Sequence, residues 1–171
     1  ADAVDAAPDG PAFELAERVL TATRDAATMD ALLLASLKHA STDGARAALT
    51  RKRIALLETQ GRFPEALPLH AQLAVELEPG DVATRSAARR GHAERGTPDE
   101  RARFLGRLAR RLPGAEGLDV VQELLDVRLS VDDKIGAEAA AKEVRERRPG
   151  DARAQRVLAD LLEEDPRREA E

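Results

Sequence analysis

The chain has 171 residues and a net charge of −5; 43% of its residues are hydrophobic, 35% are charged, and none is cysteine. This composition excludes a disordered chain, and the lack of cysteine excludes a disulfide framework or a thiolate metal site. No apolar run approaches the roughly 20 residues that a membrane helix needs, so we expect no membrane insertion. The compartment stays open, with the cytoplasm as the default.

Aromatic residues are scarce, at 2% of the chain: Phe13, Phe63 and Phe104. β-Sandwiches and barrels use β-branched and aromatic side chains on their faces. This chain instead uses Ala, Leu, Arg and Glu, which are strong helix formers. The sequence therefore predicts an all-α fold.

The first segment, residues 1–10, lacks the charged start and the apolar centre of a secretory signal. We predict that it is flexible. Because residue 1 is Ala and not Met, we expect the sequence to be a processed or excerpted piece of a longer protein.

Helix-breaking residues recur at a regular interval along the rest of the chain. Pro79-Gly80, Pro113-Gly114 and Pro149-Gly150 lie 34 and 36 residues apart. A second set of breaks, which includes Gly61 and Gly96, falls about halfway between them. Two interleaved sets at this period indicate a helix, a tight turn, a second helix and a loop to the next pair.

These breaks predict four helix pairs and a final single helix. The first helices of the pairs are expected near 11–24, 45–60, 81–95 and 115–130, the second helices near 29–40, 64–78, 98–112 and 133–148, and the final helix near 152–163. We expect Asp81 and Asp151 to cap the helices that follow them, and Thr97 with Glu100 has the spacing of a capping box. Pro68, about one turn into its helix, predicts a local distortion.

The second helices carry the clearest apolar stripes. Two stripes recur at helical spacing: Leu67, Leu69, Leu73 and Leu77 with Ala66 and Ala74, and Leu105, Leu108, Ala109 and Leu112. Apolar residues at this period are typical of a buried helix face, so we interpret both stripes as core.

One unit carries a specific family pattern. Residues 61–67 read Gly-Arg-Phe-Pro-Glu-Ala-Leu, and residues 75–81 read Val-Glu-Leu-Glu-Pro-Gly-Asp. This unit resembles the tetratricopeptide repeat, and weaker copies lie at 96–112 and 133–151. The resemblance implies a right-handed α-solenoid of about four antiparallel helix pairs plus a C-terminal capping helix.

The first helices depart from the family pattern. They offer Ile54, Leu57, Ala88 and Gly91 where the family usually has a large aromatic residue, a small residue and a Tyr. A related helical-hairpin repeat therefore stays open. The predicted organisation is a repeat domain over 11–164, with repeats at about 11–43, 44–80, 81–114 and 115–150, a cap at 151–164, and a polar tail at 165–171.

Catalytic and metal-binding motifs are missing from the sequence. His39, His70 and His92 fall on three different predicted helices, and none has a ligand spacing such as His-x-x-x-His. We expect each histidine to be a surface or boundary residue. The chain is interpreted as a non-enzyme that needs no cofactor and no metal.

The resemblance implies a non-catalytic scaffold or adaptor that binds a peptide or a helix in a concave groove lined by first helices. Many members clamp a partner's C-terminal carboxylate with a pair of Asn side chains, but this chain contains no Asn, so that clamp is absent in its usual form. The candidate contacts are basic side chains on predicted first helices: Arg51, Arg85, Arg89, Arg90 and His92. Because guanidinium groups grip carboxylates with paired hydrogen bonds, we expect an acidic protein or peptide partner.

Two other functions stay open. The block 85–111 holds nine arginines against Glu94, Asp99 and Glu100, which suggests nucleic-acid binding. The acidic flanks of the block and the lack of stacking aromatic residues argue against that function. The other alternative is a self-association module that forms a homo-oligomer through unpaired repeat faces. The candidate contact arginines, Arg51, Arg85, Arg89 and Arg90, also have a plain structural interpretation, in which they pair with nearby carboxylates such as Glu94, Glu100 or Asp119 and keep the surface soluble.

Overall fold

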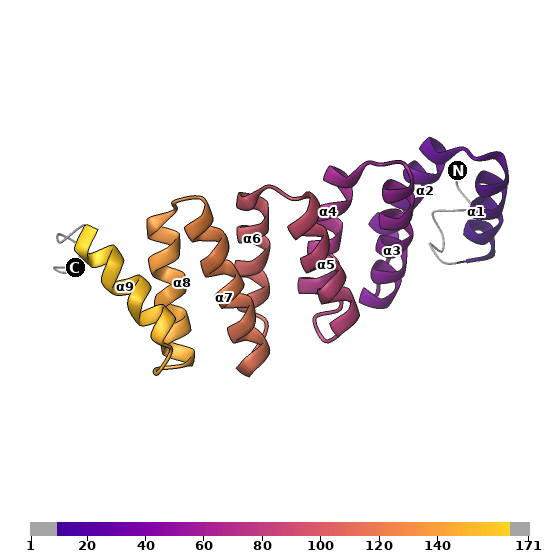
Figure 1. The fold of residues 1–171 in the computed structure, drawn as a ribbon. Helices are drawn as coiled ribbons and strands as arrows, with labels where there is room; N and C mark the ends of the chain where they lie inside the picture. The colour runs from indigo at the N-terminus through magenta and orange to yellow at the C-terminus, as the bar shows by residue number, and fades with distance from the viewer. Residues whose placement is uncertain (1–9, 165–171) are drawn as a thin grey trace. The chain divides into compact units, whose positions relative to one another are not determined.

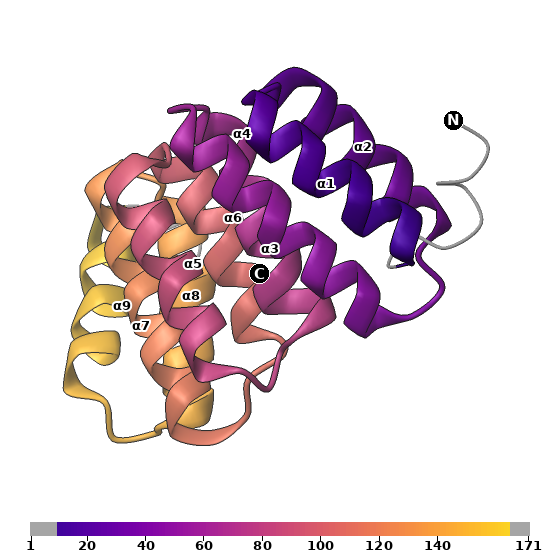
Figure 2. The same cartoon turned by 90° about the vertical axis from the view of Figure 1, so that its right-hand side faces the viewer.

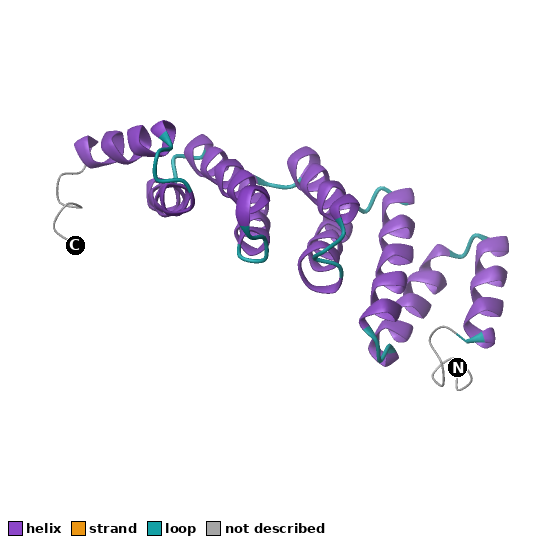
Figure 3. Cartoon of the chain, turned by 90° about the horizontal axis from the view of Figure 1, so that it is seen from below, coloured by secondary structure: helices purple, strands orange, loops and turns teal. Residues whose placement is uncertain are grey.

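A computed structural model describes residues 10–164 of the chain. The rest of the predicted N-terminal segment, 1–9, and the predicted tail, 165–171, lie outside the described residues. Within 10–164 the fold is all-α, with nine α-helices, one π-helical segment and no strand (Figures 1 and 3). The elements in chain order are α1 (Pro11–Thr23), α2 (Ala26–His39), α3 (Asp43–Thr59), α4 (Phe63–Gln72), η1 (Leu73–Leu77), α5 (Val82–Arg95), α6 (Pro98–Ala109), α7 (Gly114–Ser130), α8 (Lys134–Arg147) and α9 (Ala152–Glu164).

The chain divides into two compact units, Ala1–Gly91 and His92–Glu171, and the division falls within α5. In the first unit, α1 packs on α2, α2 packs on α3, and α3 packs on α4 and η1; α1 lies beside α2 in Figure 2. In the second unit, α6 packs on α7, α7 packs on α8, and α8 packs on α9. Consecutive helices therefore form the core of each unit.

The helix starts confirm the predicted caps. The Thr97 hydroxyl accepts a hydrogen bond from the Glu100 N–H at 3.2 Å, and the Glu100 carboxylate accepts one from the Thr97 N–H at 2.9 Å, which completes the capping box of α6. Asp81 accepts a hydrogen bond from the Thr84 N–H, and Asp151 accepts one from the Ala154 N–H. These side chains occupy backbone N–H groups that the first turn of each helix leaves without an intrahelical partner.

Backbone turns also follow the predicted breaks. Gly61, between α3 and α4, has φ +71°, and Gly114, at the start of α7, has φ +62°. Glycine adopts this left-handed conformation without the steric penalty that a Cβ brings.

The distortion expected at Pro68 lies further along the chain. Residues 63–72 keep α-helical geometry through Pro68, and the wider turns of η1 begin at Leu73. The Glu78 N–H donates to the Leu73 carbonyl oxygen at 2.8 Å, a bond that spans five residues and is typical of a π-helix. The helix predicted near 64–78 therefore continues to Leu77, but its pitch changes at Leu73.

The predicted apolar stripes are largely buried. Leu67, Leu73, Ala66 and Ala74 are buried, whereas Leu69 and Leu77 lie at the edge of a small cluster around Ile54. In the second unit, the whole predicted stripe of α6 is buried. A further cluster in the first unit joins Phe13, Met29, Leu33, Ala40 and Leu49. The core positions follow the 3.6-residue period that the sequence shows.

One polar contact recurs in the two units between helices that the sequence predicts as consecutive first helices; the predicted first helices are α1, α3, α5, α7 and α9. Arg51 of α3 points its guanidinium at Asp81, which caps α5, with 3.9 Å between Nη2 and Oδ2. Gln122 of α7 donates to Asp151, which caps α9, at 3.1 Å. In each case a side chain in the middle of one first helix reaches the capping Asp of the next.

Candidate functional site

The predicted contact residues differ sharply in exposure. Arg51 on α3 and Arg90 on α5 are exposed, Arg89 is half-buried, and Arg85 is only 5% exposed. The sequence spacing correctly places Arg85, Arg89 and Arg90 on one helix. Their different burial, however, gives them different roles. Exposed guanidinium groups can meet a partner, whereas a buried one is committed to its own fold.

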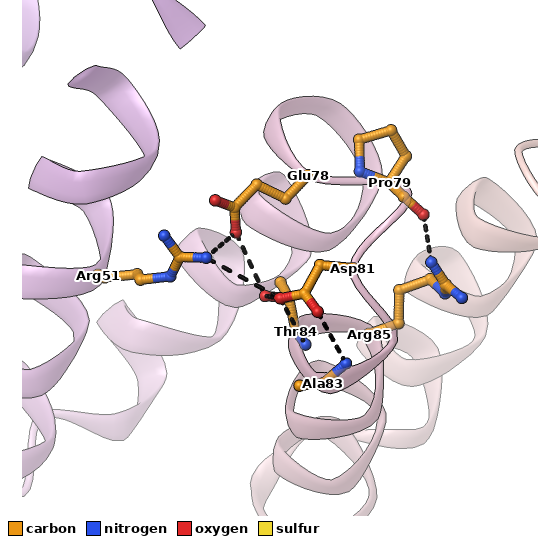
Figure 4. Close-up of polar contacts among 7 residues, drawn as sticks. All are labelled: Arg51, Glu78, Pro79, Asp81, Ala83, Thr84 and Arg85. Carbon is orange, nitrogen blue, oxygen red and sulfur yellow. Dashed lines mark hydrogen bonds and ion pairs between the residues drawn. The ribbon is translucent and has the colours of Figure 1, made fainter. Parts of the chain in front are cut away.

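Arg85 stabilises the loop that precedes its own helix. Its Nη1 donates to the carbonyl oxygen of Pro79, in the turn between η1 and α5 (Figure 4). A buried guanidinium needs such acceptors because a buried charge without a partner is costly. Arg85 therefore presents little surface to a partner, and its contact is structural.

Arg51 joins a carboxylate cluster at the start of α5. Its guanidinium pairs with Glu78 and lies 3.9 Å from Asp81, and Glu78 also accepts from the Thr84 hydroxyl at 3.3 Å (Figure 4). The Arg51 side chain keeps 51% of its surface exposed, so one side of the guanidinium still faces solvent. Arg51 thus has both a structural contact and an open face.

Asp81 is the centre of this cluster. Hydrogen bonds from the Thr84 hydroxyl and then from the Ala83 N–H hold the pKa of the Asp81 carboxyl below its usual value, and the nearby Arg51 charge acts in the same direction. Each of these groups favours the ionised form. Asp81 is therefore ionised at neutral pH, and its contacts join the start of α5 to α3.

His92 is a buried core residue, which corrects the expectation that every histidine lies at the surface or boundary. Its side chain is 3% exposed, and its ring stacks on Phe104 with 4.3 Å between centroids and 15° between planes. The flat imidazole packs like an aromatic ring because the last turn of α5 meets α6 at this point. No spacing in the sequence predicts this contact, since the two residues lie on different helices.

The other two histidines are nearer to the expectation. His39 is exposed, and His70 is half-buried with its Nε2 at 3.0 Å from a Glu58 carboxylate oxygen. Within residues 10–164, no three His, Asp or Glu side chains gather where they could hold a metal ion.

The C-terminal part of the basic block is partly neutralised within the second unit. Arg101 lies 2.8 Å from Glu123 of α7, and Arg103 lies 2.9 Å from Asp99 of its own helix. Arg95 likewise lies 3.5 Å from Glu94.

Sequence reasoning missed one polar cluster in the first unit. Asp30 of α2 is a buried residue and accepts a hydrogen bond from Arg53 Nε of α3 at 2.7 Å. Arg62, at the start of α4, lies 3.1 Å from the same carboxylate and also pairs with Glu65. Opposite charges on successive predicted helices were visible in the sequence, but the helix faces that bring them together were not.

Among the described helices, none has the length and apolar character to cross a bilayer. No protein-family model matches the sequence, and no curated protein matches it.

Proposed function

We propose that this chain is a tetratricopeptide-like, non-catalytic scaffold that holds an acidic peptide or helix of another protein. Its helices would form a right-handed α-solenoid of about four antiparallel pairs, with α9 as the capping helix. The exposed arginines Arg51 and Arg90 would provide the contacts, with the half-buried Arg89 beside them.

The repeat architecture is supported by helix order and by recurring contacts. The all-α chain alternates short turns and helices at the interval of the Pro-Gly breaks. Consecutive helices pack on each other within each unit, and a side chain of one first helix reaches the capping Asp of the next in both units. Repeats that contact their neighbours in the same way are typical of helical-repeat proteins.

The observation that carries the binding proposal is the exposure of Arg51 and Arg90 on consecutive first helices of the first unit. In the tetratricopeptide repeat family, which the sequence resembles, first helices line the concave surface where partners bind. Guanidinium groups there can form paired hydrogen bonds with the carboxylates of an acidic segment. Arg85 and His92 are left out of this contact set because both are buried.

The test is affinity capture from a lysate with the full 171-residue chain, followed by mass spectrometry and peptide mapping of the captured protein. The variant R51Q/R90E removes the charge of one exposed arginine and reverses the other. Because Arg51 also pairs with Glu78, the urea midpoint of the variant is compared with that of the native chain. We expect the variant to retain helicity and to weaken capture severalfold, because exposed charges at an interface mainly set association rate and salt dependence.

The control is R110Q/R145E, which makes the same charge change at two exposed arginines of the second unit. Retained capture by this control and lost capture by R51Q/R90E would support the assigned surface. Capture by R51Q/R90E equal to that by the native chain would reject the surface. Loss of capture by both variants would instead indicate a contact governed by net charge alone.

A further inference from the structure

The first helix of the chain has two apolar faces. Phe13 is 2% exposed and packs into the core with Leu20 partly buried beside it. On the other side of α1, Leu15 is 62% exposed and Val19 is 52% exposed. A helix that packs one apolar stripe against its own unit and shows a second stripe to solvent has a surface suited to a further partner.

The guanidinium of Arg18 flanks this outer stripe, and the carboxylates of Glu14 and Glu17 lie on the same helix. Leu15, Val19 and Ala22 occupy positions i, i+4 and i+7 of α1, so they share one face, and the exposed Arg18 lies between the first two. The outer face of α1 therefore offers two protruding aliphatic side chains with a guanidinium beside them.

The second unit contains a pocket of matching character. It has a volume of about 250 Å³ and lies where the end of α7 and the start of α8 meet α9. Its apolar lining comes from Leu129, Ala137, Val157 and Leu161. This volume and lining suit one aliphatic side chain.

The rim of this pocket is mainly acidic. Asp132, Asp133 and Asp160 line it, together with Lys134. Asp133 is already committed, because it accepts from Arg128 at 2.6 Å and from the Gly136 N–H at 2.9 Å. The exposed carboxylates of Asp132 and Asp160 leave the rim with a negative charge that an incoming guanidinium can meet.

Further exposed apolar side chains lie next in sequence to residues that line this pocket. Ile135 is 74% exposed, Val131 is 46% exposed and Leu162 is 39% exposed. Most of the exposed large aliphatic side chains in residues 10–164 thus belong either to the outer face of α1 or to the segments that form this pocket: Leu15, Val19, Leu129, Val131, Ile135 and Leu162.

We propose that α1 of one copy docks into the α7–α8–α9 pocket of a second copy, with Leu15 or Val19 in the pocket and Arg18 against Asp160 and Asp132. The two surfaces differ, so the contact is heterologous. A pair of copies then keeps one free α1 and one free pocket, so the association continues from copy to copy unless it closes into a ring. An interface centred on two side chains falls at the small, transient end of the range, so association requires high protein concentration.

The absence of cysteine makes a clean crosslinking test available. A22C places a thiol on the outer face of α1, and I135C places one at the exposed residue that follows Lys134 of the pocket rim. With a short bismaleimide reagent, the mixture of the two full-length single variants should give a covalent dimer, and neither variant alone should do so. The double variant A22C/I135C should give a ladder of trimers and larger species.

Charge reversal identifies the groups in contact. R18E and D160R should each lower the yield of the mixed dimer severalfold, and their combination, one change on each surface, should restore it. R145E, a reversal on the last turn of α8, and the thiol pair A22C with R145C serve as matched controls. Circular dichroism checks that each variant retains its helices.

Several results would overturn the proposal. A dimer from A22C alone would indicate an isologous α1–α1 contact, and an equal yield with R145C would indicate nonspecific collision. A lack of crosslinks at millimolar concentration, or a failure of the double reversal to restore the yield, would exclude a second copy as the occupant. The test uses this chain alone, so its outcome is independent of the proposed peptide binding.

Discussion

Arg53 of α3 donates through Nε to the carboxylate of Asp30 on α2 at 2.7 Å, and both side chains are largely removed from solvent, at 15% and 11% exposure. The contact fastens the second helix of one predicted pair to the first helix of the next. Arg62 approaches the same carboxylate from the start of α4 at 3.1 Å. One acidic side chain thus ties three helices of the first unit together.

Loss of the Asp30 charge should therefore destabilise the first unit. D30N keeps the size of the side chain but leaves Arg53 partly buried without its counter-charge. Breaking one partner of a buried pair is strongly destabilising, and at this partly buried position we expect a loss of about 2 kcal/mol. The measurement is the urea midpoint of the full chain, with unfolding monitored by far-UV circular dichroism.

The comparison is E17Q, which breaks the more exposed pair between Glu17 and Lys52. Exposed pairs contribute little, so its effect should stay below about 1 kcal/mol. Equal midpoints for D30N and E17Q would mean that the Asp30 cluster does not stabilise the unit.

The Asp30 carboxylate should also make the free energy of unfolding fall in acid. Burial alone would raise the pKa of Asp30, but the hydrogen bonds and charges of Arg53 and Arg62 outweigh it and hold the pKa below its usual value. The unfolded chain then binds a proton before the folded chain does, so the contribution of Asp30 is complete above about pH 4 and disappears as pH falls further. Urea midpoints at pH 7, 4 and 3 should fall more steeply for the native sequence than for D30N. Parallel curves would contradict the assigned pKa shift.

The helix order could be predicted from the sequence because its determinants are local. Pro-Gly breaks, the Thr97–Glu100 capping box and the capping Asp residues act within one turn of the chain, and the described helices begin and end within a few residues of the predicted bounds. The apolar stripes likewise needed only the helical period.

The polar cluster and the buried site residues required tertiary information. Arg101 of α6 pairs with Glu123 of α7 about two repeat lengths beyond Asp30 and Arg53, with the order of charges reversed. The sequence shows that these four charged residues are present, but it does not show which helix faces meet. For the same reason Arg85 was predicted as a contact residue, although its guanidinium folds back onto its own loop.

Two glycines of the second unit should respond oppositely to alanine. A Cβ at Gly117, in the first turn of α7, would clash with the carbonyl oxygen of Leu112 and with the Arg147 guanidinium. At Gly106, within α6, the nearest atom to a Cβ is the Leu124 Cδ2 at 3.9 Å. We expect G117A to lose about 2–3 kcal/mol through overpacking, and G106A to gain about 0.5–1 kcal/mol through helix propensity. Thermal midpoints measure both, and a similar change in the two variants would contradict the packing at Gly117.

The capping box of α6 supplies a test of local stability. T97A removes the hydroxyl that accepts from the Glu100 N–H and should cost about 1 kcal/mol. The backbone N–H of Thr97, and then its hydroxyl, hold the pKa of Glu100 below its usual value, so the effect should shrink once Glu100 is protonated in acid. T97S keeps the hydroxyl and should behave like the native chain in the same urea titration. A loss in T97S equal to that in T97A would assign the effect to the methyl group instead.

Charge reversal on α5 should separate a structural arginine from a surface one. Arg85 and Arg90 lie on the same helix, but Arg85 is 5% exposed and donates to the Pro79 carbonyl oxygen, whereas Arg90 is exposed. R85E places a carboxylate against that oxygen. The new charge is buried without a counter-charge and is also repelled by the carbonyl oxygen. We therefore expect R85E to unfold the first unit or to lower its free energy of unfolding by more than about 3 kcal/mol. R90E should leave the urea midpoint within about 0.5 kcal/mol of the native chain, since isolated surface changes have small effects. Partner capture should then fall in R90E with the fold intact, and in R85E only together with the fold. If R85E instead kept its urea midpoint and lost capture, its guanidinium would belong to the binding surface and the structural role assigned to it would be wrong.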